Sequence, residues 1–217
     1  MSHPTPFSSA RLTYHAIRQP DDLALFKAIN ADQTGYQNSN ASNIKLPSHA
    51  DAEKFMKATA EENLLGAVIW LAPENQQTAG EIKARRNAGE IVEAWGTAIG
   101  ELHLSALPAH LTHHRWTELG IDILPAYQGR GYGAEAIGWA LDYAFRRAGL
   151  HRVKIRAFEW NTGAIRLYKK LGFTVEGSER EALWFEGRWW DGVEMGMLES
   201  EWWEMERTTQ RGEEERA

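Results

Sequence analysis

Cysteine is absent from the 217 residues of this chain. The chain therefore has no disulfide framework, no cysteine nucleophile and no thiolate metal site, and this composition favours a reducing, cytoplasmic location. No apolar run approaches the roughly 20 residues that cross a bilayer, and the N-terminus has no basic segment followed by an apolar one, so we expect neither a membrane protein nor a secreted one. The net charge of −6 disfavours nonspecific binding of nucleic acid and favours cationic ligands.

The residues that are present suit a single globular domain. Hydrophobic residues make up 43% and charged residues 25% of the chain, which is ordinary for such a domain. We expect the domain at 8–203, a flexible arm at 1–7 and a disordered charged tail at 204–217. Periodicity predicts strands at 11–17, 64–71, 91–107, 115–124, 151–158, 174–186 and 188–198, and helices at 21–30, 48–62, 133–148 and 162–171. We expect a polar loop at 33–43 and a surface insertion at 73–90.

The most informative segment is a glycine-rich turn, Gln128-Gly129-Arg130-Gly131-Tyr132-Gly133, which lies between a predicted strand and a predicted helix. Alternating glycines let the backbone turn tightly, and the N–H groups then point into one concavity at the positive end of the helix. Such a concavity binds phosphate. No Gly-Lys-Ser/Thr follows, so this is not the common nucleotide-binding loop. The G-x-G-x-x-G spacing of dinucleotide-binding loops is met only in its looser form, with Ala134 in place of the last glycine. A tight turn without a ligand remains the alternative.

A second segment supports the ligand-binding interpretation. Asn161 is placed to cap a helix that Gly172 ends, and Ala164, Leu167 and Tyr168 fall on one face of it. Tyr168 therefore carries its hydroxyl on the inward side. Packing in the core is the alternative role for this residue.

Together the two segments resemble the GNAT superfamily of N-acetyltransferases, closest to its branch of ribosomal-protein and spermidine acetyltransferases. The resemblance also takes in the start of the chain and the C-terminal hairpin, and it covers roughly residues 8–203. It implies an α/β (α+β) fold with a mixed, mostly antiparallel sheet of about seven strands flanked by helices on both faces. It further implies transfer of an acetyl group from acetyl-CoA to a primary amine.

The resemblance also assigns roles to residues. The backbone of Gln128, Gly129, Arg130, Gly131, Tyr132, Gly133 and Ala134 would hold the pyrophosphate of acetyl-CoA. The backbone of Ile121, Asp122 and Ile123 would pair with the pantetheine arm, and Asn161 and Ala164 would also contact the cofactor. Tyr168 would donate a proton to the departing thiolate.

The base that takes the amine's proton is less well defined by the sequence. We predict Glu118, which shares a strand face with Asp122, and Glu101 with His103 on the neighbouring strand form a second candidate pair. A salt-bridged strand residue is the alternative role for each. We predict no metal, because His110, His113 and His114 lie in a loop without acidic or cysteine partners. The cluster Lys83, Arg85 and Arg86 is expected to be a solvated part of the insertion.

Two functions remain in view. The first is an N-acetyltransferase whose acceptor is a peptide N-terminus, a polyamine or another small amine. A homodimer is compatible with this function. The second is a non-catalytic module that binds acyl-CoA, because a fold does not guarantee an activity. A nicotinamide-dependent enzyme fits poorly, since the glycine turn comes after residue 120 and not in an opening βαβ unit.

Overall fold

The computed structural model describes residues 5–72, 92–93 and 96–214. The expected insertion at 73–90, with Lys83, Arg85 and Arg86, lies outside the described residues. The chain divides into two compact units, one made of residues 1–106 and 120–139 and the other of residues 107–119 and 140–217. Strand β5 (Trp116–Ile123) and helix α5 (Tyr132–Asp142) each contribute residues to both units.

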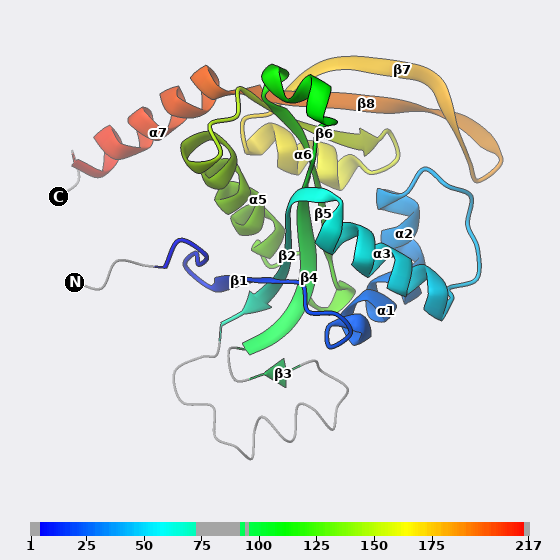
Figure 1. The fold of residues 1–217 in the computed structure, drawn as a ribbon. Helices are drawn as coiled ribbons and strands as arrows, with labels where there is room; N and C mark the ends of the chain where they lie inside the picture. Colours follow the sequence, from blue (N-terminus) through cyan, green and yellow to red (C-terminus); the bar gives the residue numbers. More distant parts are fainter. Residues whose placement is uncertain (1–4, 73–91, 94–95, 215–217) are drawn as a thin grey trace. The chain divides into compact units, whose positions relative to one another are not determined.

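The first unit is built on antiparallel strands with helices on both faces (Figure 1). Its strands pair in the order β1-β2-β4, with β3 added to β4, and β5 follows β4. The elements are β1 (Leu12–Ala16), α1 (Leu23–Ala31), α2 (Gln33–Ser39), α3 (His49–Glu61), β2 (Asn63–Leu71), β3 (Val92–Glu93) and β4 (Gly96–Ser105).

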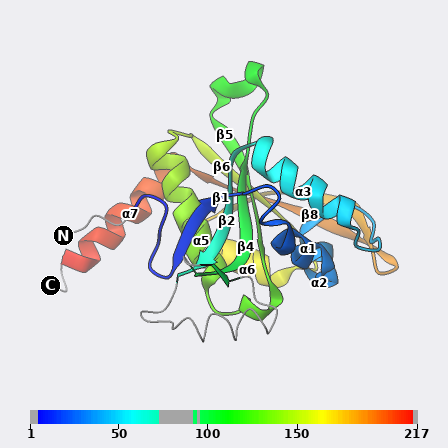
Figure 2. The same ribbon diagram turned by 60° about the horizontal axis from the view of Figure 1, so that its bottom comes forward.

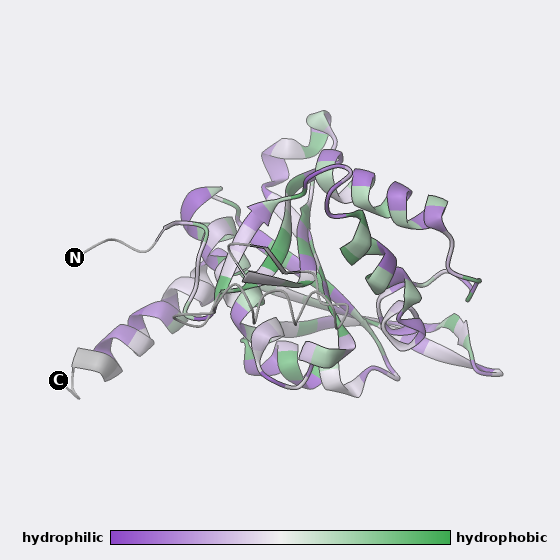
Figure 3. Cartoon of the chain, turned by 90° about the horizontal axis from the view of Figure 1, so that it is seen from below, coloured by the Kyte–Doolittle hydropathy of each residue, from purple (hydrophilic) through white to green (hydrophobic). Residues whose placement is uncertain are grey.

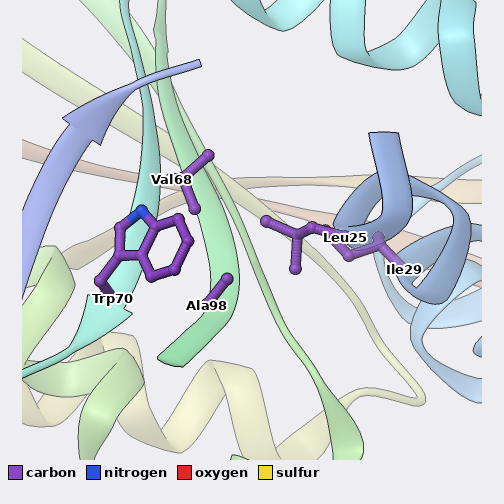
Figure 4. Packing of buried hydrophobic residues seen from close by; sticks show 5 residues of the cluster. All are labelled: Leu25, Ile29, Val68, Trp70 and Ala98. Atoms are coloured by element: carbon purple, nitrogen blue, oxygen red, sulfur yellow. The ribbon is translucent and has the colours of Figure 1, made fainter. Parts of the chain in front are cut away.

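One apolar cluster of the first unit fixes α1 on the sheet. Val68 and Trp70 of β2 and Ala98 of β4 project from the same face and pack against Leu25 and Ile29 of α1 (Figure 4). All five are at least nine-tenths buried. Residues alternate between the two faces of a strand, so Ile69 of β2 is directed to the opposite face.

That opposite face carries the start of α5. Tyr14 of β1, the register partner of Ile69, stacks on Trp139 of α5 with ring centroids 3.7 Å apart. Trp139 Nε1 also donates to the carbonyl oxygen of Pro6, and the Tyr14 N–H donates to that of Phe7. Thr5–Phe7, part of the segment expected to be a flexible arm, are therefore hydrogen-bonded to the unit.

The second unit contains the other half of the strands. They pair in the order β5-β6-β8-β7, with β5 and β6 parallel and the other pairs antiparallel. Its elements are a 3₁₀ turn (Ala109–His114), β6 (Arg152–Phe158), α6 (Thr162–Lys170), β7 (Thr174–Phe185), β8 (Arg188–Leu198) and α7 (Glu199–Glu214). The 3₁₀ turn stands clear of β5, which follows it (Figure 2).

Two segments differ from the prediction. Residues 33–39 of the expected loop form α2, in which the Tyr36 N–H donates to Asp32 O and the Ser39 hydroxyl to Gly35 O. Its polar composition hid it, since no residue of α2 is fully buried. Residues 204–214 of the expected disordered tail continue α7, which is mostly hydrophilic (Figure 3). Trp202 is buried against Phe145 and so anchors this helix to the second unit, which composition alone does not reveal.

Candidate active site

The glycine turn has the geometry of an anion site. Strand β5 ends at Ile123, a 3₁₀ turn covers Pro125–Tyr127, and α5 begins at Tyr132. Gly129 and Gly131 adopt φ of +71° and +82°, a left-handed region that disfavours residues with a Cβ. The Gln128 side chain donates to Ile123 O at 2.7 Å and ties the turn back to the strand. The predicted strand–turn–helix order is confirmed, and the unpaired N–H groups at the start of α5 give the turn its positive end.

An acidic cluster lies in the same unit and consists of Glu101 on β4, Asp122 on β5 and Asp32 just before α2. The Glu101 side chain is fully buried, and its Oε2 lies 3.1 Å from His103 Nδ1. Its other oxygen, Oε1, has no hydrogen-bond partner among the residues that the structure describes. The His103 ring lies over Gly120, where any Cβ would collide with it. A buried carboxylate oxygen without a hydrogen-bond partner is costly to the folded state.

Asp122, a member of the acidic cluster, has a strongly shifted pKa. Desolvation, followed by the negative charge of Glu101, raises the pKa of Asp122 to about 7. A hydrogen bond with Ser39 and the charge of His103 act in the opposite direction, and Asp32 adds to the rise. A carboxyl group that titrates near neutral pH can take up a proton from an acceptor and release it to solvent. Ser39 was missed from the sequence because the segment 33–43 was expected to be a loop, and Asp32 because it lies between that loop and the helix expected at 21–30.

Glu118, the predicted base, has a different environment in the second unit. Its Oε1 accepts from Arg156 Nε at 2.6 Å, and its register partner on β6 is Lys154. The parallel ladder between β5 and β6 consists of three pairs and ends at Glu118. The Glu118 carboxylate is therefore held in an ion pair on the edge between β5 and β6.

Helix α6 carries the remaining predicted residues, also in the second unit. Asn161 is its N-cap, and the side-chain Oδ1 accepts from the Ala164 N–H at 3.1 Å. Tyr168 is the buried residue of this helix and packs near Phe173, with ring centroids 6.1 Å apart. The predicted cap and the inward position of Tyr168 are confirmed.

Two histidines of the 3₁₀ turn lie side by side. The rings of His113 and His114 lie 3.9 Å apart. Within residues 5–72, 92–93 and 96–214, no group of three or more histidine, aspartate or glutamate side chains is placed to hold a metal ion. The same residues include no helix with the length and apolar character needed to cross a bilayer.

Comparisons with known proteins agree on one family. The family model described as "Acetyltransferase (GNAT) domain" matches residues 11–174. The spermidine N(1)-acetyltransferase of Vibrio cholerae is 36% identical over 89 residues, which are 41% of this chain and 51% of that protein, so the chain spans about half the length of this relative. An uncharacterized N-acetyltransferase of Bacillus subtilis is 26% identical over 159 residues, 70% of this chain and 90% of that protein.

Solved structures show the same fold. The structure of the Vibrio cholerae spermidine N-acetyltransferase in complex with CoA and spermine has a TM-score of 0.66 at 23% identity, covering 89% of this chain and 98% of that one. A GNAT-family acetyltransferase from Bacillus anthracis has a TM-score of 0.67 at 18% identity, covering 89% and 98%. The predicted mixed sheet with flanking helices is thereby confirmed. Because the family model matches most of the chain, the protein belongs to the GNAT family of acetyltransferases.

Proposed function

We propose that this protein transfers the acetyl group of acetyl-CoA to a primary amine of a small, positively charged acceptor. The observation that carries the proposal is the turn at Gln128–Gly133. In a chain of this family, it presents two left-handed glycines at the N-terminus of a helix. A family member found with CoA and spermine supports both the donor and the class of acceptor.

The residues that hold the donor follow from this assignment. The backbone N–H groups from Gln128 to Ala134 bind the pyrophosphate, and the backbone of Ile121–Ile123 pairs with the pantetheine arm. By the resemblance to the family, Asn161, whose Oδ1 caps α6, and Ala164 are also assigned contacts with acetyl-CoA.

The chemical step requires one proton to be taken up and one to be given. The amine nitrogen attacks the thioester carbonyl, the carbon–sulfur bond breaks, and the nitrogen loses a proton. Tyr168 gives a proton to the departing thiolate. We assign the proton acceptor to the acidic cluster, with Asp122 as the titrating group, in preference to Glu118, whose carboxylate is paired with Arg156.

The negative charge of the acidic cluster also favours one class of acceptor amine. Glu101 and Asp122, with Asp32 nearby, concentrate negative charge in the first unit, and the whole chain carries a net charge of −6. This charge favours an aliphatic amine with more than one positive group over a neutral one. A peptide N-terminus is the second candidate, since another family member, from Bacillus subtilis, is named a putative ribosomal N-acetyltransferase. A cytoplasmic location and a homo-oligomer are part of the same proposal, the latter supported by the dodecameric Vibrio cholerae relative.

A calorimetric titration of acetyl-CoA tests the donor site. Ala134→Asp adds a carboxylate at the start of α5, where the helix tolerates it, and should abolish binding by repelling the pyrophosphate. Gly138→Asp is the matched control, because a Cβ at this exposed position of the same helix has no neighbour within 4 Å, and it should bind like the wild type. Absence of binding by the wild type would reject the proposal.

A turnover assay then separates an enzyme from a binding module. Spermidine, a neutral aromatic amine and a short peptide with a free N-terminus are offered with acetyl-CoA, and release of free thiol is followed. Rapid turnover of spermidine alone supports the polycationic acceptor. Binding of acetyl-CoA without turnover of any amine would favour the non-catalytic module.

A further inference from the structure

Arg11, just before β1, contacts both the glycine turn and the first turn of α5 within the first unit. Its Nε donates to Glu135 Oε2 at 2.7 Å, and its backbone N–H donates to Glu135 Oε1 at 2.6 Å. Its Nη1 donates to the carbonyl oxygen of Arg130 at 3.1 Å. The guanidinium also lies over the Tyr132 ring, 4.5 Å from its centroid. One side chain therefore joins the middle of the turn to the first turn of α5.

The bond to Arg130 sets the direction of a peptide group. In a planar trans peptide the carbonyl and the following N–H point in opposite directions. Because the Arg130 carbonyl is directed to Arg11, the Gly131 N–H is directed away from Arg11. Gly131 adopts the left-handed conformation next to this peptide group. A Cβ at Gly131 would lie only 3.4 Å from Nη2 of Arg11, so the guanidinium packs closely against the glycine.

Glu135 holds the other end of the same arrangement. Its backbone N–H donates to Gly131 O at 3.1 Å, so it closes the first turn of the helix onto the loop. Its Oε1 also accepts from the Ser9 hydroxyl at 2.7 Å. Burial alone would raise the pKa of Glu135, but the hydrogen bonds from Arg11 and Ser9 outweigh it and the pKa is lowered. The carboxylate is thus held charged beside the guanidinium.

We propose that Arg11 is a positioning residue of the donor site, which fixes the turn at Gln128–Gly133 in the conformation that presents its N–H groups to a pyrophosphate. This inference rests on the proposed function for the identity of the ligand, but the ordering of the turn by Arg11 does not. Arginine suits this position because its planar guanidinium holds five N–H donors in a fixed geometry, whereas lysine carries a single ammonium group on a flexible stem.

The test compares two variants that each break a bond to the same carboxylate. Arg11→Ala removes the side-chain bonds to Arg130 and Glu135 and keeps the backbone bond to Glu135, while Ser9→Ala removes one bond to Glu135 and leaves the turn's carbonyl contact intact. Amide hydrogen exchange of residues 129–133 is measured without ligand, and CoA binding is measured by calorimetry. Arg11→Lys, which keeps the charge, serves if the alanine variant does not fold.

Arg11→Ala should speed exchange in the turn and weaken CoA binding by about ten- to a hundredfold, the effect expected for lost charge-assisted hydrogen bonds. Ser9→Ala should do neither, and Arg11→Lys should restore only part of the affinity. Unchanged exchange in Arg11→Ala, or an equal effect of Ser9→Ala, would overturn the inference. Faster exchange in a protein whose wild type does not bind CoA would uphold the ordering role and reject the proposed function instead.

Discussion

Replacing Asp122 with asparagine should make this protein more stable and less active. Desolvation and the negative charges of Glu101 and Asp32 destabilise the ionised form of Asp122. The hydrogen bond with Ser39 and the charge of His103 stabilise it by less, so the pKa rises from 3.8 to about 7. A raised carboxyl pKa means that the folded state binds a proton more tightly than the unfolded state does. Ionisation of Asp122 therefore favours unfolding.

The size of the effect follows from the two pKa values. Below pH 3.8 both states hold the proton and the penalty vanishes; between pH 3.8 and about 7 only the folded state holds it, and stability falls as the pH rises. At about 1.4 kcal/mol for each pKa unit, the penalty is about 2 kcal/mol at pH 5 and about 4 kcal/mol at pH 8. Asparagine carries no such penalty, so the stability difference between variant and wild type should grow by about 2–3 kcal/mol over this range.

Urea unfolding at the two pH values measures this difference, and the pH dependence of kcat/KM supplies the second readout. The wild type should gain activity as the pH rises through about 7, the pKa of Asp122, because only the ionised carboxylate accepts a proton. Asp122→Asn should lose most of the activity and this rise with it.

A variant that is destabilised equally at pH 5 and pH 8 would refute the reasoning. It would mean that Asp122 is ionised and stabilising at both values, as an ordinary hydrogen-bonded carboxylate is. An unchanged pH profile of the residual activity would likewise remove Asp122 from the chemistry.

Three further changes test the remaining assignments. Tyr168→Phe should lower kcat by about ten- to a hundredfold at an almost unchanged KM for acetyl-CoA, as steady-state rates will show; a full-rate variant would leave Tyr168 a packing residue. Glu118→Gln breaks the ion pair with Arg156, which is 59% exposed, and should cost less than about 1 kcal/mol in thermal unfolding; loss of activity with normal stability would restore Glu118 as the base. Leu25→Ala empties part of the cluster on β2 and should cost about 2–5 kcal/mol in urea unfolding, whereas a cost near zero would contradict the packing of α1.

Sequence patterns were sufficient for the elements with strong local signals. The glycine turn, the Asn161 cap and the apolar run of β2 each depend on residues within one short segment, and each is found where it was predicted. Helix α2 and the last turns of α7 were missed because polar residues without an apolar stripe carry no such signal. Their hydrogen bonds and the buried Trp202 hold them instead.

The sequence alone determined the family, the turn that suits a phosphate group and the helix that carries Tyr168, since neighbouring residues specify all three. Only the tertiary structure decided which partners surround each carboxylate of β5. Glu118 and Asp122 lie four residues apart on one strand, yet one is paired with Arg156 and the other is desolvated near Glu101. The same holds for Arg11, whose partner Glu135 is distant in sequence. A side chain's charge and reach depend on which remote elements pack beside it, and no local pattern records that.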